Sequence, residues 1–426
     1  MANPTRPLPA EAFLQEGTYA RTRLPVELAS TLIPDAYTSP DFFELERDRV
    51  LRTSWVVVGC SSQLERPGDT LVTDIGGQSL IITRSAGGTL NAFHNVCRHR
   101  GARLLEPGSC HLERYIKCPY HSWAYGLDGA CLGTPLFDAG SEVPADQRGI
   151  FDMDDVSQFD KADHGLHPAA AEQWGCLVFA NLDAGAAPLA EQLGDLPQRL
   201  AGYRLDEWRV VRSKAYEIEA NYKLIGENFM EYYHLPWVHP GLVKVSPMKA
   251  HHRWQGPGMY TGMCTSPIAE NSDQGGWKGL PPISGLSESD ATSARFAWLF
   301  PNTALNVLPN HVFVMVATPT SAGHTSEQTY LLAHPESSQG PDSDEAIDGL
   351  ATFWDAVNQE DIAIVERVQQ GLGSLAYTGG RMCYRFEEPL HRYQNMVVDR
   401  MLGIRRIPPG DAEYESAMFG ERNAGV

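Results

Sequence analysis

Residues 97–123 read CRHRGARLLEPGSCHLERYIKCPYHSW, and the organisation of the whole chain can be worked out from this stretch. It opens with the pair Cys97 and His99 and closes with the pair Cys118 and His121, with 18 residues between the two pairs. Two thiolates and two imidazoles at such spacing suit either of two metal sites. One is a tetrahedral structural zinc ion. The other is a [2Fe–2S] cluster in which two Cys hold one iron and two His hold the other.

Short β-rich runs separated by turn residues surround these pairs. Between Trp55 and Thr134 the chain contains WVVVG, TLVT, SLIITR, TLNAF, RYIKC and HSWAYGL, with Pro-Gly, Gly-Gly and Asp-Gly among them. Short strands at regular spacing predict a small all-β domain, which we assign to residues 51–160. Residues 1–50 are expected to form an arm and a helix. Residues 161–426 mix strands with helices, which predicts an α+β domain.

A second constellation lies in the run NYKLIGENFMEYYHLPWVHP. His234 and His239 are five residues apart, and Pro236 between them is expected to end or kink a helix, so that both imidazoles converge. Glu227, Glu231 and His234 are spaced to share one face of that helix. Taken alone, two histidines at this spacing form a weak pattern, and core or surface histidines fit it better.

Two converging histidines need an anionic third ligand, because two His and one carboxylate with open positions are typical of non-haem Fe(II) oxygenases. A helix expected over 344–372 offers Asp355, Glu360, Asp361 and Glu366. At about 100° per residue, Asp361 falls in the middle of an apolar stripe, and the other three acids point to the sides or away. The stripe consists of Leu350, Trp354, Val357, Val365, Val368 and Leu372. A lone buried Asp is costly unless it pairs or binds a metal, so the periodicity singles out Asp361.

The composition excludes several classes of partner. The 426 residues carry 34 Lys and Arg against 53 Asp and Glu, and this net charge of −19 disfavours nucleic acid and anionic membrane surfaces. No apolar run approaches the ~18 residues of a membrane span, and the start, MANPTRPLPA, lacks the apolar core of a secretion signal. We therefore expect a cytoplasmic protein without a membrane or nucleic-acid partner. Six cysteines are then expected to be buried small hydrophobes rather than disulfides: Cys60, Cys110, Cys131, Cys176, Cys264 and Cys383.

The segments CRHRG and CPYHSW resemble the metal loops of a Rieske domain. With the second constellation, the chain from about Phe42 to Leu402 resembles the α (terminal oxygenase) subunit of Rieske non-haem iron oxygenases. The resemblance implies a small all-β Rieske domain plus a helix-grip (START-like) antiparallel sheet and helix, with 161–426 as the catalytic domain on which the 1–50 arm packs. It implies a small-molecule substrate, O2, and electrons from a flavin- or ferredoxin-type reductase, with NAD(P)H used only through that reductase. It also implies a head-to-tail homotrimer that passes electrons between subunits.

The resemblance assigns roles to individual residues. The [2Fe–2S] ligands are Cys97, His99, Cys118 and His121, and the mononuclear Fe(II) ligands are His234, His239 and Asp361. Glu231, three residues before His234, corresponds to a carboxylate that bridges the two centres across the subunit interface, and Asn228 is a further catalytic candidate.

The residue at position 231 also bears on the substrate. Asp is commoner there in the family, and Glu within ENxxExYH resembles the branch that oxidises quaternary ammonium compounds such as glycine betaine and carnitine. The expected reaction is N-demethylation or hydroxylation of a betaine-type amine. An aromatic ring-hydroxylating mono- or dioxygenase and, more remotely, a non-catalytic Rieske electron carrier remain as alternatives.

Three further expectations concern the second domain. Aromatic residues are expected to line the pocket, with candidates Tyr232, Tyr233, Trp237, Trp254, Trp277, Phe296, Trp298 and Phe300. The Gly-, Pro- and Ser-rich segment 265–290 is either a substrate lid or an insertion. Residues 371–376 match a dinucleotide fingerprint but follow a helix, so they are interpreted as a helix end with Gly371 or Gly373 as a left-handed cap.

Overall fold

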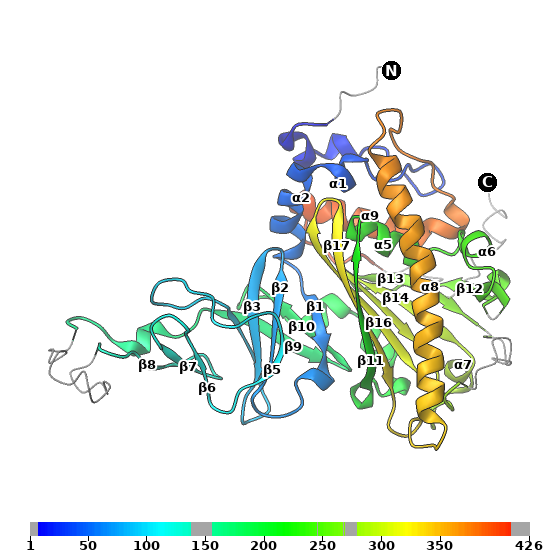
Figure 1. Ribbon diagram of the computed structural model, residues 1–426. Helices are drawn as coiled ribbons and strands as arrows, with labels where there is room; N and C mark the ends of the chain where they lie inside the picture. The colour runs from blue at the N-terminus through cyan, green and yellow to red at the C-terminus, as the bar shows by residue number, and fades with distance from the viewer. Residues whose placement is uncertain (1–6, 138–155, 245, 267, 269–278, 410–426) are drawn as a thin grey trace. The chain divides into compact units, whose positions relative to one another are not determined.

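The computed structural model describes residues 7–137, 156–244, 246–266, 268 and 279–409. The chain divides into two compact units, each of which contains a large β-sheet (Figure 1). Unit 1 comprises Met1–Val57, Trp174–Cys176 and Ala187–Val426, and unit 2 comprises Val58–Gln173 and Leu177–Ala186. Among the described residues, no helix is both long and apolar enough to cross a membrane.

Unit 2 is built from short strands, as the turn-punctuated sequence predicts. Its larger sheet has the order β1-β10-β9-β4-β3-β2-β5, and a smaller sheet has the order β6-β7-β8. The strands are β1 (Val56–Cys60), β2 (Asp69–Ile75), β3 (Gln78–Arg84), β4 (Leu90–His94), β5 (Gly108–His111), β6 (Tyr115–Lys117), β7 (Ala124–Gly126), β8 (Cys131–Gly133), β9 (Pro168–Trp174) and β10 (Leu177–Asn181). Ile116 and Tyr125 of the smaller sheet pack with Cys97, Cys118 and Trp123 in one apolar cluster. The predicted metal loops therefore belong to the core of this unit.

Unit 1 contains a seven-stranded antiparallel sheet of order β11-β17-β16-β15-β14-β13-β12. The strands are β11 (Arg209–Ile218), β12 (His251–Arg253), β13 (Tyr260–Thr265), β14 (Ala294–Leu299), β15 (Thr303–Val307), β16 (Val312–Ser321) and β17 (His324–Ala333). Every residue of β13 and β15 is buried. Burial of successive residues means that both faces of the sheet are covered there, since side chains alternate between faces.

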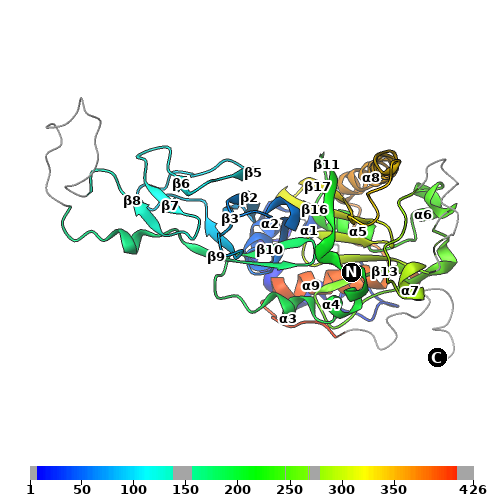
Figure 2. The same ribbon diagram turned by 90° about the horizontal axis from the view of Figure 1, so that it is seen from below.

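The helices of unit 1 are α1 (Asp35–Thr38), α2 (Pro40–Glu46), α3 (Leu189–Leu193), α4 (Leu196–Arg199), α5 (Tyr222–Phe229), α6 (Leu235–Val238), α7 (Glu288–Ala291), α8 (Ser343–Leu372) and α9 (Tyr384–Met401). The long helix α8 runs along the sheet and is seen almost end-on in the view from below (Figures 1 and 2). It contacts β11 and α5, while α5 contacts β15, β16 and α9. An antiparallel sheet held against a long helix confirms the predicted helix-grip class.

Short helical turns connect these elements. They are 3₁₀ helices at Ala10–Leu14, Glu16–Tyr19, Ser61–Gln63, Lys161–His164, Ala201–Tyr203, Leu205–Glu207, Leu242–Lys244 and Met248–Ala250, and a π-helical turn at Arg47–Leu51. The α2 helix begins where the sequence favours it, because the Ser39 hydroxyl accepts a hydrogen bond from the Phe42 N–H and Pro40 occupies the first turn.

The predicted apolar stripe of α8 is largely right. Leu350, Trp354, Val365 and Leu372 are buried. Val368 is 43% exposed, so this part of the stripe is wrong. Gln369 takes its place, because its amide accepts from the Asn221 N–H and donates to the Tyr37 carbonyl, both at 3.0 Å. Leu372, one turn further on, is buried as predicted, so the departure from the apolar pattern is local to Val368.

The end of α8 also differs in detail from the prediction. The helix ends at Leu372, as interpreted from the sequence. Its C-cap Gly373 has φ −69°, however, and Gly371 lies within the helix, so the predicted left-handed cap is wrong. The cap N–H instead bonds back to the carbonyls of Gln370 and Gly371 in a tightened right-handed turn.

Candidate metal centres

The two Cys/His loops of unit 2 share one backbone geometry. In each loop the cysteine N–H donates to the carbonyl five residues later, at 2.8 Å for Cys97 and 2.7 Å for Cys118. Each cysteine carbonyl accepts from the N–H four residues later, at 3.0 Å and 3.1 Å. Those fourth residues, Gly101 and Ser122, have φ values of 71° and 61°. A non-glycine residue at positive φ is costly, so the second loop is held in this shape by its surroundings.

The side chains of these loops converge in a way that fits a two-iron cluster. The thiols of Cys97 and Cys118 are buried and interact with each other. The rings of His99 and His121 have centroids 4.7 Å apart. The Nδ1 atom of His99 is buried without a hydrogen-bond partner, and its ring stacks on Trp123 at 5.0 Å. A buried ring nitrogen without a protein hydrogen-bond partner, close to two thiols, fits the role of a metal ligand.

The protonation of His99 suits metal binding. Burial, followed by the nearby His121 and Arg100, lowers the pKa of His99 below its usual value. A neutral imidazole is the form that binds a metal. The donor set of two sulfurs and two nitrogens therefore fits a Rieske cluster.

The chain between α5 and α6 corrects one prediction. The helix ends at Phe229, so Glu227 and the pair Glu231 and His234 do not share a helix face. Pro236 occupies the first turn of α6 and does not terminate a preceding helix. The Glu231 carboxylate accepts hydrogen bonds from the N–H groups of Tyr233 and His234, and this local bonding competes with helix continuation.

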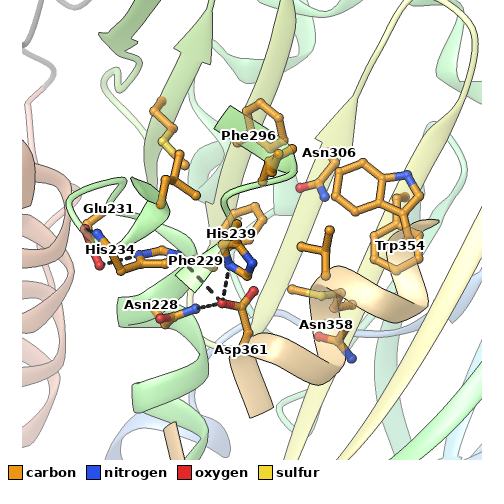
Figure 3. Close-up of a pocket in the computed structure, with 16 residues that line it drawn as sticks. Asn228, Phe229, Glu231, His234, His239, Phe296, Asn306, Trp354, Asn358 and Asp361 are labelled. Atoms are coloured by element: carbon orange, nitrogen blue, oxygen red, sulfur yellow. Dashed lines mark hydrogen bonds and ion pairs between the residues drawn. The ribbon is translucent and has the colours of Figure 1, made fainter. Parts of the chain in front are cut away.

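The structure brings His234, His239 and Asp361 together, with one ligand atom of each within 4.8 Å of the others (Figure 3). The Asp361 Oδ1 atom lies 2.8 Å from His239 Nε2 and 3.6 Å from His234 Nε2. Asn228 donates from Nδ2 to the same oxygen at 2.7 Å, which fixes the carboxylate. Two imidazole nitrogens and one carboxylate facing a pocket are the donor set of a non-haem Fe(II) site.

A carboxylate holds the outer nitrogen of each histidine. Glu231 Oε1 lies 2.5 Å from His234 Nδ1, and Glu360 Oε2 lies 2.6 Å from His239 Nδ1. Both rings therefore turn Nε2 toward the metal position. Periodicity predicted that Glu360 points to the side of the apolar stripe or away from it, and its hydrogen bond to His239 Nδ1 was not predicted. Glu360 precedes Asp361 by one residue, so helical periodicity turns it about 100° around the helix from Asp361. Nothing in the sequence indicates that His239 lies on the side of the helix that Glu360 faces.

Asp361 and Glu360 both affect the protonation of His239. Burial disfavours its charged form, but the hydrogen bonds and charges of Asp361 and Glu360 outweigh burial, so the pKa of His239 is raised. A metal ion bound at His239 would compete with protonation of that ring.

We expect Glu360→Gln to weaken iron binding about 10- to 100-fold, because the loss of a carboxylate behind a metal-bound histidine has this typical cost. Iron affinity measured by competition with a chelator checks it. The matched control is Glu366→Gln on the same helix, where the carboxylate accepts the Glu219 N–H and, among the described residues, contacts neither histidine of the triad; iron affinity should be unchanged. Equal affinity in the two variants would contradict the role of Glu360.

A pocket of about 490 Å³ opens beside the triad. Its lining comprises Asn228, Phe229, Glu231, His234, Leu235, His239, Leu242, Met263, Phe296, Asn306, Phe313, Met315, Trp354, Val357, Asn358 and Asp361.

The predicted pocket aromatics are mostly wrong, since only Phe296 lines the pocket. Tyr232, Trp254, Trp298 and Phe300 lie in the core, whereas Tyr233 and Trp237 are exposed. Trp277, like residues 269–278 as a whole, lies outside the described residues. The rings that do line the pocket come from α5, β14, β16 and α8, because the alternation of each strand and the register of α8 decide which rings face inward.

The remaining cysteines depart from expectation in two places. Cys60, Cys131, Cys176 and Cys264 are buried, as predicted. Cys110 is exposed and Cys383 is partly exposed, so burial was the wrong expectation for these two. All four residues of β5, which carries Cys110, are exposed, because this strand forms the sheet edge.

Two family models match separate parts of the chain. Residues 54–146 match the Rieske [2Fe-2S] domain, and residues 205–403 match the catalytic domain of the ring hydroxylating alpha subunit.

Individual relatives carry the comparison further. The carnitine monooxygenase oxygenase subunit of Acinetobacter baumannii is 31% identical over 352 residues, which cover 80% of this chain and 85% of the relative. The glycine betaine monooxygenase oxygenase subunit of Chromohalobacter salexigens is 28% identical over 397 residues, covering 86% and 84%. A solved quaternary ammonium Rieske monooxygenase, described for carnitine oxidation and inter-subunit electron transfer, superposes with a TM-score of 0.73 at 26% identity, covering 92% of this chain and 99% of that one.

Proposed function

The chain belongs to the Rieske non-haem iron oxygenases, and on this basis we propose that it oxidises an N-methyl group of a small quaternary ammonium compound. It is an oxidoreductase that uses a Rieske [2Fe–2S] cluster, mononuclear iron, O2 and electrons from a reductase. The alternative of a non-catalytic electron carrier is wrong, because residues 205–403 match a catalytic domain. The zinc alternative for the first constellation is likewise wrong, because residues 54–146 match a [2Fe-2S] domain.

The walls of the pocket carry the proposal of a cationic substrate. The rings of Phe229, Phe296, Phe313 and Trp354 line it, together with the carboxylates of Glu231 and Asp361. No Lys or Arg is among the described residues of the lining. Aromatic faces attract quaternary ammonium ions by about 0.5–2 kcal/mol per contact. A positively charged head group is therefore favoured here, and the relatives named for carnitine and glycine betaine support that class.

The ligand assignments belong to the same proposal. Cys97 and Cys118 hold one iron of the cluster and His99 and His121 the other, while His234, His239 and Asp361 hold the mononuclear iron. The convergence of each set, described above, supports the assignment. When bound, the mononuclear iron supplies the redox chemistry that activates O2.

The protein's own side chains prepare this site. Asn228 fixes Asp361, and Glu231 fixes His234 in the orientation that points Nε2 inward. Leu235, Leu242 and Met263 contribute apolar walls that keep water from the reacting methyl group. Glu231 is also proposed as the link through which electrons arrive from a cluster.

The proposed reaction balances as follows. A trimethylammonium compound, O2, two electrons and two protons give the hydroxymethyl product and water. The hydroxymethyl group on nitrogen then leaves as formaldehyde, which releases the dimethylamine and one proton. The electrons come from the reductase through the cluster, and the protons come from solvent.

Exposed aromatic residues beside both centres support a head-to-tail trimer. Tyr120, next to His121, is 57% exposed, and Trp237, close after His234, is 79% exposed. Large exposed rings are typical of interaction surfaces. We therefore propose that the cluster of one subunit serves the iron of the next, as the description of inter-subunit electron transfer in the solved relative suggests.

The function is tested with the purified chain and a surrogate reductase. We expect O2 uptake and formaldehyde release with glycine betaine, carnitine, γ-butyrobetaine or choline. The matched control replaces the quaternary nitrogen of the best substrate by carbon, which keeps the shape and removes the charge. It should bind at least about 10-fold more weakly, because the cation–π attraction is lost. The pocket's apolar walls also suit an arene, so diol or phenol formation from naphthalene without turnover of any ammonium compound would overturn the proposal in favour of ring hydroxylation.

A further inference from the structure

Glu327 of β17 is a buried carboxyl group that the site described above does not use. Its side chain is fully buried. Asn358 of α8 donates from Nδ2 to Glu327 Oε1 at 2.7 Å, and the second oxygen, Oε2, has no hydrogen-bond partner. Among the described residues, no Lys or Arg forms an ion pair with it. A buried acid with one unpartnered oxygen needs an explanation.

A small internal cavity supplies that explanation. Glu327 lines it together with Asp361, Asn228 and Asn358, and the rest of its wall consists of Ile218, Ile225, Phe229, Met315, Ile362 and Val365. About 10 Å³ of it is open to the centre of a water molecule, which is close to the minimum for one ordered water. Asn228, Asn358 and Asp361 also line the substrate pocket (Figure 3), so the cavity adjoins the iron site.

The surroundings of Glu327 favour the protonated acid. An ionised carboxylate in an apolar layer without a cation is strongly disfavoured. Burial raises the pKa of Glu327 to about 7, against the hydrogen bond from Asn358 and with the support of the Asp361 charge. The group can thus hold a proton near neutral pH and release it.

A polar connection joins Glu327 to the protein surface. The Tyr216 hydroxyl forms a hydrogen bond with Asn358 and is close enough to Glu327 for the ionised carboxylate to raise the pKa of the tyrosine. The hydroxyl donates a hydrogen bond to Asp355 Oδ1 at 2.6 Å. Asp355 also binds Lys214 Nζ at 2.6 Å and is 37% exposed at a surface groove of about 630 Å³. The Tyr216 hydroxyl therefore lies between Asp355, which is partly exposed to solvent, and the buried Glu327. From this position it can help to return a proton to Glu327.

We propose that Glu327, acting through a water molecule in this cavity, delivers protons from solvent to the iron site. The proposal rests on the O2-consuming function proposed above, and not on which substrate is oxidised. Each turnover consumes two protons with two electrons and one O2. Glu327 gives one proton to the water, which passes one on toward the pocket. The resulting carboxylate takes the proton of the Tyr216 hydroxyl, and the tyrosine is restored by a proton that reaches it from solvent through Asp355. No net charge is left on the chain after the cycle.

The test compares Glu327→Gln with Glu217→Gln. Glutamine keeps the size of the side chain and an oxygen for Asn358 but holds no exchangeable acid proton. Glu217 lies on the neighbouring strand β11, paired with Ser326, and its side chain is 65% exposed, so its variant is a matched control. We expect Glu327→Gln to keep its iron content and to slow single-turnover product formation by about 10- to 100-fold, at the lower end of acid–base effects. Its solvent deuterium isotope effect should rise, and Glu327→Asp, which retains an acid proton, should recover part of the rate.

Infrared spectroscopy provides a readout that does not depend on turnover. Burial also raises the pKa values of Glu227 and Glu387 to about 7, so the readout is the difference spectrum between the wild-type protein and Glu327→Gln, in which their bands cancel. At neutral pH that difference should contain a protonated carboxyl band that shifts in D2O, whatever the substrate. Its absence, or a single-turnover rate of Glu327→Gln within about twofold of the wild type, would overturn the proposal. Loss of iron from both Glu327→Gln and Glu327→Asp would identify a structural role and also overturn it. If wild-type O2 uptake requires an arene instead of an ammonium compound, the function proposal fails while the infrared band still tests Glu327.

Discussion

A chain with Asp361→Asn is expected to lose the mononuclear iron and keep the Rieske cluster. The carboxylate is the only anionic member of the triad and lies within 3.6 Å of both histidine Nε2 atoms. A neutral amide oxygen is a much weaker ligand for Fe(II). Iron content should fall from about three to about two per chain with the cluster's visible spectrum unchanged. Turnover should fall by on the order of 10³-fold or more, since a catalytic metal supplies several kcal/mol.

The control for Asp361→Asn is Glu366→Gln, which removes an acid one turn further along α8 and should retain all the iron. Retention of about three irons by Asp361→Asn would contradict the assignment of this ligand.

The same variant tests the proposed trimer. Asp361→Asn subunits, which keep the cluster, can be co-assembled with Cys118→Ser subunits, which lose the cluster but keep the iron site. Head-to-tail electron transfer predicts that the mixture regains activity that neither variant has alone. A mixture as inactive as its components would show that electrons do not cross between subunits.

Glu231→Gln is expected to keep the Rieske cluster and, in protein loaded with excess iron, to stop electrons from reaching the mononuclear iron; its iron affinity should fall to a similar extent as in Glu360→Gln, because both carboxylates hold the Nδ1 atom of a proposed iron ligand. The Glu231 carboxylate accepts from the Tyr233 and His234 N–H groups and holds His234 Nδ1 at 2.5 Å. An amide removes the negative charge and disturbs this bonding, while His234 Nε2 remains available to the metal. We expect turnover to fall at least about 100-fold, the upper end for partners that orient metal ligands.

The measurement for Glu231→Gln starts from a chemically reduced cluster. After mixing with O2 and substrate, the variant's cluster should stay reduced while that of the wild type is oxidised within one turnover. Glu231→Asp keeps a carboxylate one methylene shorter and should retain part of the rate. Glu360→Gln provides the contrast, because it should weaken iron binding and leave electron transfer intact in fully loaded protein. Rapid cluster oxidation in Glu231→Gln would remove Glu231 from the electron path.

Much of the fold was predictable from the residues, and so was the convergence of His234, His239 and Asp361. Period-two strands with turn residues identified the all-β unit, and the 3.6-residue period of α8 singled out Asp361 among four acids. Other features were not predictable. The end of α5 at Phe229 depends on the Glu231 carboxylate competing for backbone N–H groups, and the exposure of Val368 accompanies hydrogen bonds from Gln369 to distant residues. The helix α9, which contains Pro389, carries a breaker that argues against a helix in the sequence.

The kinds of metal centre were indicated by the amino acids through their resemblance to a known family, because the Cys and His spacing alone left zinc and [2Fe–2S] open. The groups that support those centres were decided only by the tertiary structure. Glu360 reaches His239 across 121 residues, and Glu327 reaches Asn358 across 31. No local pattern encodes such pairs, because they result from the packing of α8 against the sheet. Packing also decides which aromatic rings line the pocket. Phe313 and Trp354 become pocket walls only when β16 and α8 face each other.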